Sequence, residues 1–79
     1  MRVYEGTKLV ELYCNQCGKK LQVKDDMIMD GVFAVDYKWG YFSKRDGTKT
    51  SFELCEACYE KLTEQFIYPA EEEDYHELL

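Results

Sequence analysis

Residues 52–59, FELCEACY, decide the fold, because a strand-like run meets a helix-like run at a pair of cysteines. A second pair lies upstream in residues 14–17, CNQC, and the chain of 79 residues has four cysteines in all. Two such CxxC pairs supply four thiolates, which is the ligand set of a closed tetrahedral zinc site. We therefore predict one structural Zn²⁺ bound by Cys14, Cys17, Cys55 and Cys58. Four thiolates also bind iron, so the residue types alone leave the metal open.

The length of the chain favours such a metal staple. Seventy-nine residues make one domain, near the size at which a hydrophobic core alone gives little stability. Hydrophobic residues make up 46% of the sequence and aromatic residues 15%, which argues against a disordered chain. We predict a single four-cysteine domain over residues 1–68 and an acidic C-terminal tail over residues 69–79. His76 in that tail is the only histidine, and four cysteines do not need it as a ligand.

Charge is distributed unevenly along the sequence. Residues 1–50 carry a net charge of +2, whereas residues 51–79 carry −8. The acidic C-terminal third would repel a nucleic acid. The sequence has no apolar run near the ~20 residues that a membrane helix needs, and its first residues lack the apolar core of a signal peptide. We therefore expect a cytoplasmic protein with no membrane partner. In that reducing compartment, CxxC pairs are more often metal or redox sites than structural disulfides.

Residues 32–42 form the clearest strand pattern, with aromatic and aliphatic side chains at every second position. Asp46-Gly47 follows and predicts a two-residue hairpin turn. That turn would place Trp39 opposite Leu54 and Tyr41 opposite Phe52. A longer loop of matching parity would keep the same faces together. We expect Trp39 to be buried near Leu54, against the helix.

The other elements follow from shorter patterns. Residues 7–13 predict a strand before the first cysteine pair, and residues 21–23 predict another after it. Gly18 suits a backbone conformation that side chains disfavour. We expect Met27 and Met29 to fill gaps in the core. A helix begins at Cys55 and stops before Pro69, and its predicted apolar stripe is Tyr59, Leu62 and Phe66.

The order of these motifs resembles the treble-clef zinc finger: a knuckle at Cys14, Cys17 and Gly18, a hairpin at Asp46-Gly47, and a helix whose first turn holds Cys55 and Cys58. The CxxCGK start and residues 39–59 are also similar to small uncharacterised bacterial zinc-finger proteins. The resemblance implies a small α+β domain with a zinc knuckle, a β-hairpin and a C-terminal helix. It names no activity, because this fold serves many functions. The histidines of the HNH-nuclease version are missing from residues 32–66.

Three functions stay open at this point. The first is a structural zinc module that acts by protein–protein contact, with a protein partner or a second copy of the chain, and without enzyme activity or a small-molecule substrate. The second is a small nucleic-acid-binding or transcription-regulating zinc finger, with seven basic residues between Lys19 and Lys49 and with Trp39 stacking on bases. The third is a thiol–disulfide exchanger that uses Cys55 and Cys58 at a helix start.

Overall fold

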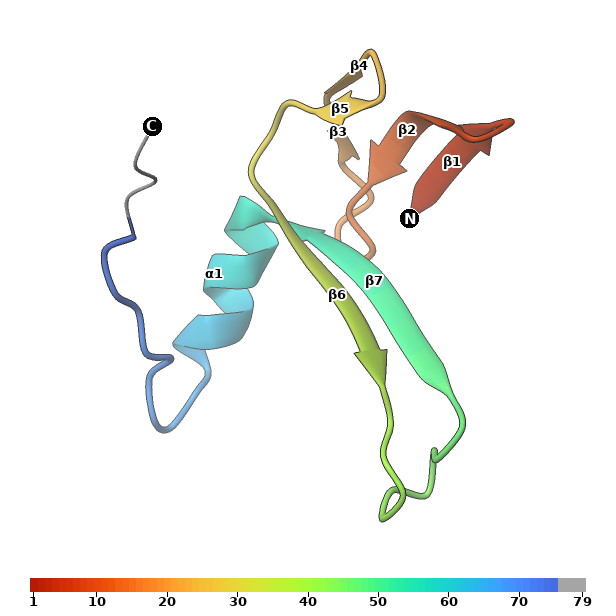
Figure 1. Cartoon of the computed structure of the whole chain (residues 1–79). Helices are drawn as coiled ribbons and strands as arrows, with labels where there is room; N and C mark the ends of the chain where they lie inside the picture. The colour runs from red at the N-terminus through yellow and green to blue at the C-terminus, as the bar shows by residue number, and fades with distance from the viewer. Residues whose placement is uncertain (76–79) are drawn as a thin grey trace.

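The computed structural model describes residues 1–75 and consists of small antiparallel sheets followed by a helix (Figure 1). The elements in chain order are β1 (Arg2–Glu5), β2 (Lys8–Tyr13), β3 (Lys20–Leu21), β4 (Val23–Lys24), β5 (Met27–Ile28), β6 (Val32–Lys38), β7 (Lys49–Cys55) and α1 (Glu56–Glu64). The chain is therefore a small α+β domain, as the sequence predicts. Residues 76–79, including His76, lie outside the described part, and the predicted boundary between residues 68 and 69 stays a prediction.

The first sheet has the order β1-β2-β3 and carries the first cysteine pair at its end. The predicted strand 7–13 is confirmed as β2, and Leu12 on it pairs with Leu21 on β3. Both leucines are almost fully inaccessible to solvent. β1 was not predicted from the sequence, and it pairs with β2 through a tight turn at Gly6, whose φ of 65° suits glycine. This sheet therefore anchors one side of the core.

β4 and β5 form a miniature hairpin whose two turn residues, Asp25 and Asp26, have φ of 51° and 66°. Positive φ at both central residues is the geometry of a two-residue hairpin turn, which aspartate tolerates. The prediction that Met27 and Met29 fill the core is wrong, since they are 62% and 55% exposed. Ile28 between them packs against the core instead, because successive side chains of a strand point to opposite faces.

β6 and β7 form the long hairpin that the sequence predicts, but with a different register. Phe33 pairs with Leu54 and Val35 with Phe52, so the predicted pairs of Trp39 and Tyr41 are wrong. Asp46-Gly47 does occupy the centre of a turn, closed by the Thr48 amide donating to the Arg45 carbonyl at 2.8 Å. Further turns between residues 40 and 46 lengthen the loop, so pairing ends at the Trp39 amide, which donates to the Thr48 carbonyl. The observed register differs from the predicted one by an even number of residues, so each side chain lies on the face of the hairpin that was predicted for it.

Trp39 therefore lies at the far end of the hairpin and is only half-buried, which corrects the prediction that it packs near Leu54. Its Nε1–H donates to Thr50 Oγ1 at 2.8 Å, and the Arg45 guanidinium lies 5.5 Å from its ring centroid. Phe33 takes the position beside Leu54 and packs against Tyr59 of α1, with ring centroids 4.9 Å apart. The aromatic contact between hairpin and helix exists, but it is made by another residue.

The helix is shorter and less covered than predicted. It ends at Glu64 rather than near Pro69, and Leu62 and Phe66 of the predicted stripe are exposed. Pro69 restricts only the backbone of the residue directly before it, so it sets an outer limit for the helix and not the position of its end. Within residues 1–75, no helix has the length and apolar character needed to span a lipid bilayer.

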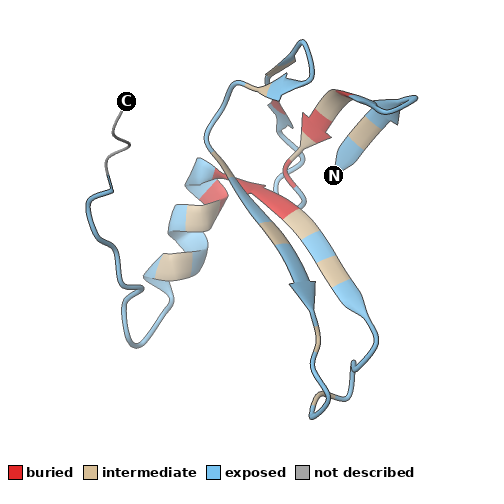
Figure 2. Cartoon of the chain, viewed as in Figure 1, coloured by how far each residue is buried: buried red, intermediate tan, exposed pale blue. Residues whose placement is uncertain are grey.

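Most of the buried residues gather at one place, where β2, β3, the end of β7 and the first turn of α1 meet (Figure 2). This core cluster consists of Leu12, Cys14, Leu21, Leu54, Cys55 and Cys58. Half of its members are cysteines, so the core is built around the sulfur atoms. A core this small gives little hydrophobic stabilisation by itself.

Candidate metal centre

The first cysteine pair lies on a knuckle that follows β2. The Cys14 amide donates to the Lys19 carbonyl at 2.9 Å, and the Gly18 amide donates to the Cys14 carbonyl at 3.0 Å. Gly18 has a φ of 79°, which confirms the predicted backbone conformation. The Cys17 amide also points at the Cys14 sulfur, at 3.5 Å. The knuckle therefore presents both sulfurs from one tight turn.

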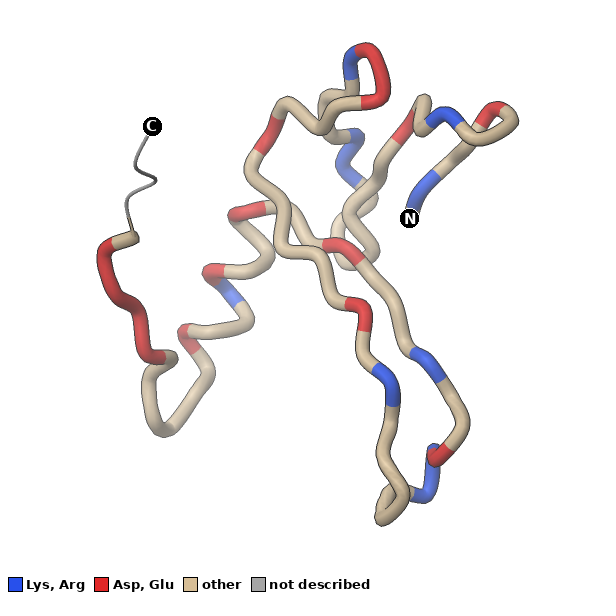
Figure 3. Tube along the Cα trace, in the orientation of Figure 1, with Lys and Arg blue, Asp and Glu red and all other residues tan. Residues whose placement is uncertain are grey.

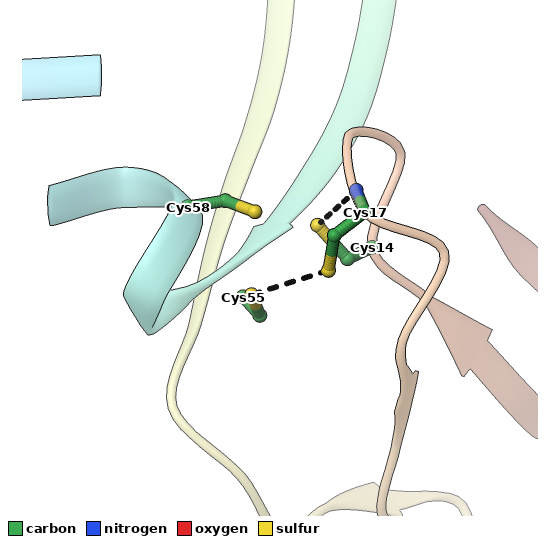
Figure 4. Close-up of side chains that lie close together, drawn as sticks. All are labelled: Cys14, Cys17, Cys55 and Cys58. Carbon is green, nitrogen blue, oxygen red and sulfur yellow. Dashed lines mark hydrogen bonds between the residues drawn. The ribbon is translucent and has the colours of Figure 1, made fainter. Parts of the chain in front are cut away.

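The second pair lies where the strand β7 becomes the helix α1. Cys55 is the last residue of β7 and caps the helix with φ of −70° and ψ of 164°, and Cys58 lies in the first turn. The extended backbone at Cys55 and the helical turn after it direct both sulfurs toward the knuckle (Figure 4). Strand pairing with β6 holds Cys55 opposite Val32, which fixes the end of β7.

The four sulfur atoms all lie within 4.8 Å of one another. Those of Cys17 and Cys55, which come from different pairs, are 3.8 Å apart (Figure 4). A metal–sulfur bond of about 2.3 Å in a tetrahedron corresponds to sulfur–sulfur separations of about 3.8 Å. Cys14, Cys55 and Cys58 are buried and Cys17 is exposed, and none forms a disulfide. The four cysteines are thus placed to bind one metal ion, and zinc fits this donor set.

The electrostatics of the cluster also favour a cation. Burial alone raises the pKa of the Cys14 thiol, but hydrogen bonds from the backbone of Cys17, Cys55 and Gln16 outweigh it and lower the pKa to about 6. Burial, hydrogen bonds from the other cysteines and the charge of Cys14 raise the pKa of Cys58 to about 12. Cys58 therefore ionises beside the Cys14 thiolate only where a positive charge lies close to both. A divalent cation at the centre would supply that charge.

Asn15 and Glu53 join the knuckle to β7, and the sequence reasoning missed both. The Asn15 amide donates to the Glu53 carbonyl at 2.8 Å, and the Glu53 amide donates to Asn15 Oδ1 at 2.9 Å. The buried Glu53 carboxylate accepts from the Met1 amine at 2.9 Å and from Arg2 Nε at 3.2 Å. We call these four residues the clamp. The clamp joins the knuckle that carries the first cysteine pair to the strand that leads into the second pair.

The residue pattern around Glu53 carries no signal of the clamp. An acidic residue between Phe52 and Leu54 belongs to the face of β7 opposite to the apolar one, where solvent exposure is the default expectation. Glu53 is nevertheless buried, because β1 and the knuckle cover that face of β7. Only the pairing of β1 with β2, which the sequence did not reveal, brings Arg2 to it.

Comparison of this chain with protein-family models, with curated proteins and with solved structures found no match. The sulfur cluster and the surfaces around it are therefore the features that point to a function.

Proposed function

We propose that this protein is a structural zinc-binding module that acts through protein–protein contact. The observation that carries the proposal is the gathering of four sulfurs between the knuckle and the start of α1, with three of the four cysteines in the buried core cluster. A metal bound there links both halves of the chain. Four protein ligands would fill a tetrahedral site and leave no position for water or substrate, which is typical of structural zinc.

The same features argue against thiol–disulfide exchange by the cysteine pair at the helix start. A thiol–disulfide exchanger needs an accessible nucleophilic thiolate. Cys55 and Cys58, the pair at the helix start, are both buried, and burial is the largest factor that raises the pKa of Cys58. We propose that the protein is not an enzyme and that its arrangement of knuckle, hairpin and helix is a variant of the treble clef.

Exposed apolar side chains support the contact half of the proposal. Tyr41 and Phe42 are 83% and 98% exposed at the end of the hairpin, and Ile67 and Tyr68 are similarly exposed after α1. Exposed aromatic residues that share a small region are typical of protein interfaces. A domain with such a small core has no interior in which to place them.

Metal analysis and chelation test the structural half. We expect one zinc per chain, and we expect removal of the metal to unfold the domain, since zinc in small fingers contributes about 10 kcal/mol or more of apparent binding energy. That is comparable with the whole stability of a small domain. Circular dichroism before and after chelation measures the change, and re-addition of zinc is the control. A native spectrum after verified metal loss contradicts the proposal, and a coloured protein that contains iron corrects the metal.

Affinity capture tests the contact half. We expect the wild-type protein to retain a partner that is lost with Tyr41→Ser and Phe42→Ser together, and kept with Met27→Ser. Met27 is a matched control because it is also exposed and lies on a different hairpin. Equal retention by all three proteins would move the interface away from the long hairpin.

A second candidate is nucleic-acid binding, which one observation favours. Trp39 is partly exposed beside Arg45, and the same end of the hairpin carries three other basic residues: Lys38, Lys44 and Lys49. Aromatic faces among cations bind single-stranded nucleic acid. The net charge of −6 opposes it. A gel-shift assay at low salt with single-stranded oligonucleotides decides, because this candidate requires retention that Trp39→Ala abolishes.

A further inference from the structure

The far end of the long hairpin projects from the metal core (Figure 1). We call residues 37–49 the hairpin arm. The radius of gyration of the chain is 15.1 Å, whereas a compact domain of this length has about 12 Å. The difference arises because the hairpin arm and the residues after α1 both extend away from the buried cluster (Figure 1). Each of these two segments therefore offers its surface to a partner.

The hairpin arm is basic and its cations are accessible. It contains four basic residues and one acidic residue, a net charge of +3 (Figure 3). Lys38, Lys44, Arg45 and Lys49 are all exposed. Lys49 lies 3.5 Å from Asp36, but within residues 1–75 no carboxylate pairs with the other three cations. The exposed rings of Tyr41 and Phe42 lie between the cations along the arm.

The segment after α1 has the opposite charge. Residues 71–74, Glu-Glu-Glu-Asp, carry a net charge of −4, and we call them the acidic segment. They are exposed and belong to no helix or strand, and none of them forms an ion pair within the described part of the chain. Tyr75 follows directly and is 81% exposed. The acidic segment thus combines negative charge with an aromatic ring, which complements the hairpin arm.

We propose that the partner of the hairpin arm is a second copy of this chain, with the acidic segment of each copy lying on the hairpin arm of the other. This deepens the protein-contact function proposed above and rests on it. A two-fold dimer makes such a contact twice, because the same pair of surfaces meets at both ends. Opposite charges then align the two chains, and the exposed rings of the arm gain apolar cover.

The charge pattern favours a second copy over a nucleic acid. A second copy has the same net charge of −6, but it meets the hairpin arm with four carboxylates that match the four cations in number, whereas a polyanion carries negative charge along its whole length.

Two charge-reversed proteins test the proposal. The arm variant carries Lys44→Glu and Arg45→Glu, and the segment variant carries Glu72→Lys and Glu73→Lys. All four positions are exposed and distant in sequence from the cysteines, so the metal content should not change. Sedimentation equilibrium over a range of protein concentrations measures the dimer dissociation constant at low salt, where screening is weak.

We expect the wild type to dimerise and each variant alone to have a dissociation constant at least about tenfold higher. We expect an equimolar mixture of the two variants to regain dimerisation, because the acidic arm of one then meets the basic segment of the other, and the remaining pair keeps its native charges. A matched control is Lys8→Glu with Lys24→Glu, two exposed lysines outside the hairpin arm, which should leave dimerisation unchanged. Salt at about 0.5 M should weaken the wild-type dimer.

Several outcomes overturn the proposal. These are a wild type that stays monomeric at every concentration, variants that dimerise as well as the wild type, and a mixture that does not regain dimerisation. A monomer whose size depends on salt would mean that the acidic segment folds onto its own arm. Retention of a single-stranded oligonucleotide by the wild type, lost in the arm variant, would assign the arm to nucleic acid. Metal content and circular dichroism of each protein report separately on the structural zinc, so either half can fail alone.

Discussion

Asn15→Ala should weaken metal binding although Asn15 is not a ligand. Its Oδ1 accepts from the Glu53 amide and from the Met1 amine, both at 2.9 Å. The Glu53 amide belongs to a buried residue, and a buried donor without its partner costs about 1–3 kcal/mol. Water reaches the exposed Asn15 position and replaces part of the lost bond, so we expect about 1–2 kcal/mol.

That loss should appear in the metal affinity. If the metal-free chain is unfolded, the free energy of folding is part of the apparent free energy of metal binding. A cost of 1–2 kcal/mol then lowers the apparent zinc affinity by roughly 5- to 30-fold, since about 1.4 kcal/mol is a factor of ten. Competition against a chromophoric zinc chelator at constant pH measures the ratio between variant and wild type.

Gln16→Ala is the matched control. Gln16 is the neighbouring knuckle residue, its side chain is exposed, and its backbone contact to Cys14 does not depend on the side chain. We expect its zinc affinity to equal that of the wild type. An Asn15→Ala protein with unchanged affinity would refute the reasoning, because the clamp would then not contribute to holding the cysteine pairs together.

Three further predictions concern stability. In thermal or denaturant unfolding, Leu12→Ala should lower stability by about 3 kcal/mol or more and Trp39→Ala by only about 1–2 kcal/mol. Leu12 is fully buried, whereas the larger Trp39 is not. The reverse order would mean that Trp39 is a core residue. Burial alone raises the pKa of Glu53, but the Met1 amine and Arg2 hold it below the ordinary value of 4.5. The difference in free energy of unfolding between wild type and Glu53→Gln should therefore be largest at pH 7 and shrink as the pH falls below about 4.5. A difference that persists at lower pH would contradict the pairing. Gly18→Ala should cost about 1 kcal/mol from backbone strain alone, since no atom lies within 4 Å of the added Cβ, and a much larger loss of stability would mean a clash.

The position of the cysteine pairs could be predicted from the sequence because their chemistry is local. Gly18 after Cys17 marks the knuckle, and Cys55 at the change from period two to helical spacing marks the start of α1. Each signal needs only a few neighbouring residues. The two pairs then have to meet, whatever path the chain between them takes.

The register of the long hairpin could not be predicted in the same way. Asp46-Gly47 forms a turn, but the sequence does not say whether the strands continue up to it. The even offset keeps Phe33, Val35 and Trp39 on one face, so the faces were right and the partners wrong. Parity is fixed by the pleat of the strand, whereas the end of pairing depends on the turns that begin at Gly40.

Burial was the least predictable property. Hydrophobic periodicity assumes that an apolar face has something to cover it, and this small chain covers only the region around its sulfurs. Tyr37, Leu62 and Phe66 follow the expected patterns and are nevertheless exposed. The clamp shows the opposite case, in which the charged Glu53 is buried because β1 and the knuckle bring it partners.

The projecting hairpin arm is also the part of the chain whose sequence can change without disturbing the metal-binding core. The arm lies within the loop between Cys17 and Cys55, yet it is remote from the sulfurs and makes no contribution to the buried cluster. Doubling the length of a flexible loop costs only about 0.6 kcal/mol in closure entropy. Insertions or wholesale replacement between Gly40 and Gly47 should thus leave the metal-bound scaffold intact. The metal-binding core can therefore serve as a scaffold for a replaceable loop, in which new binding sequences can be selected without redesign of the core.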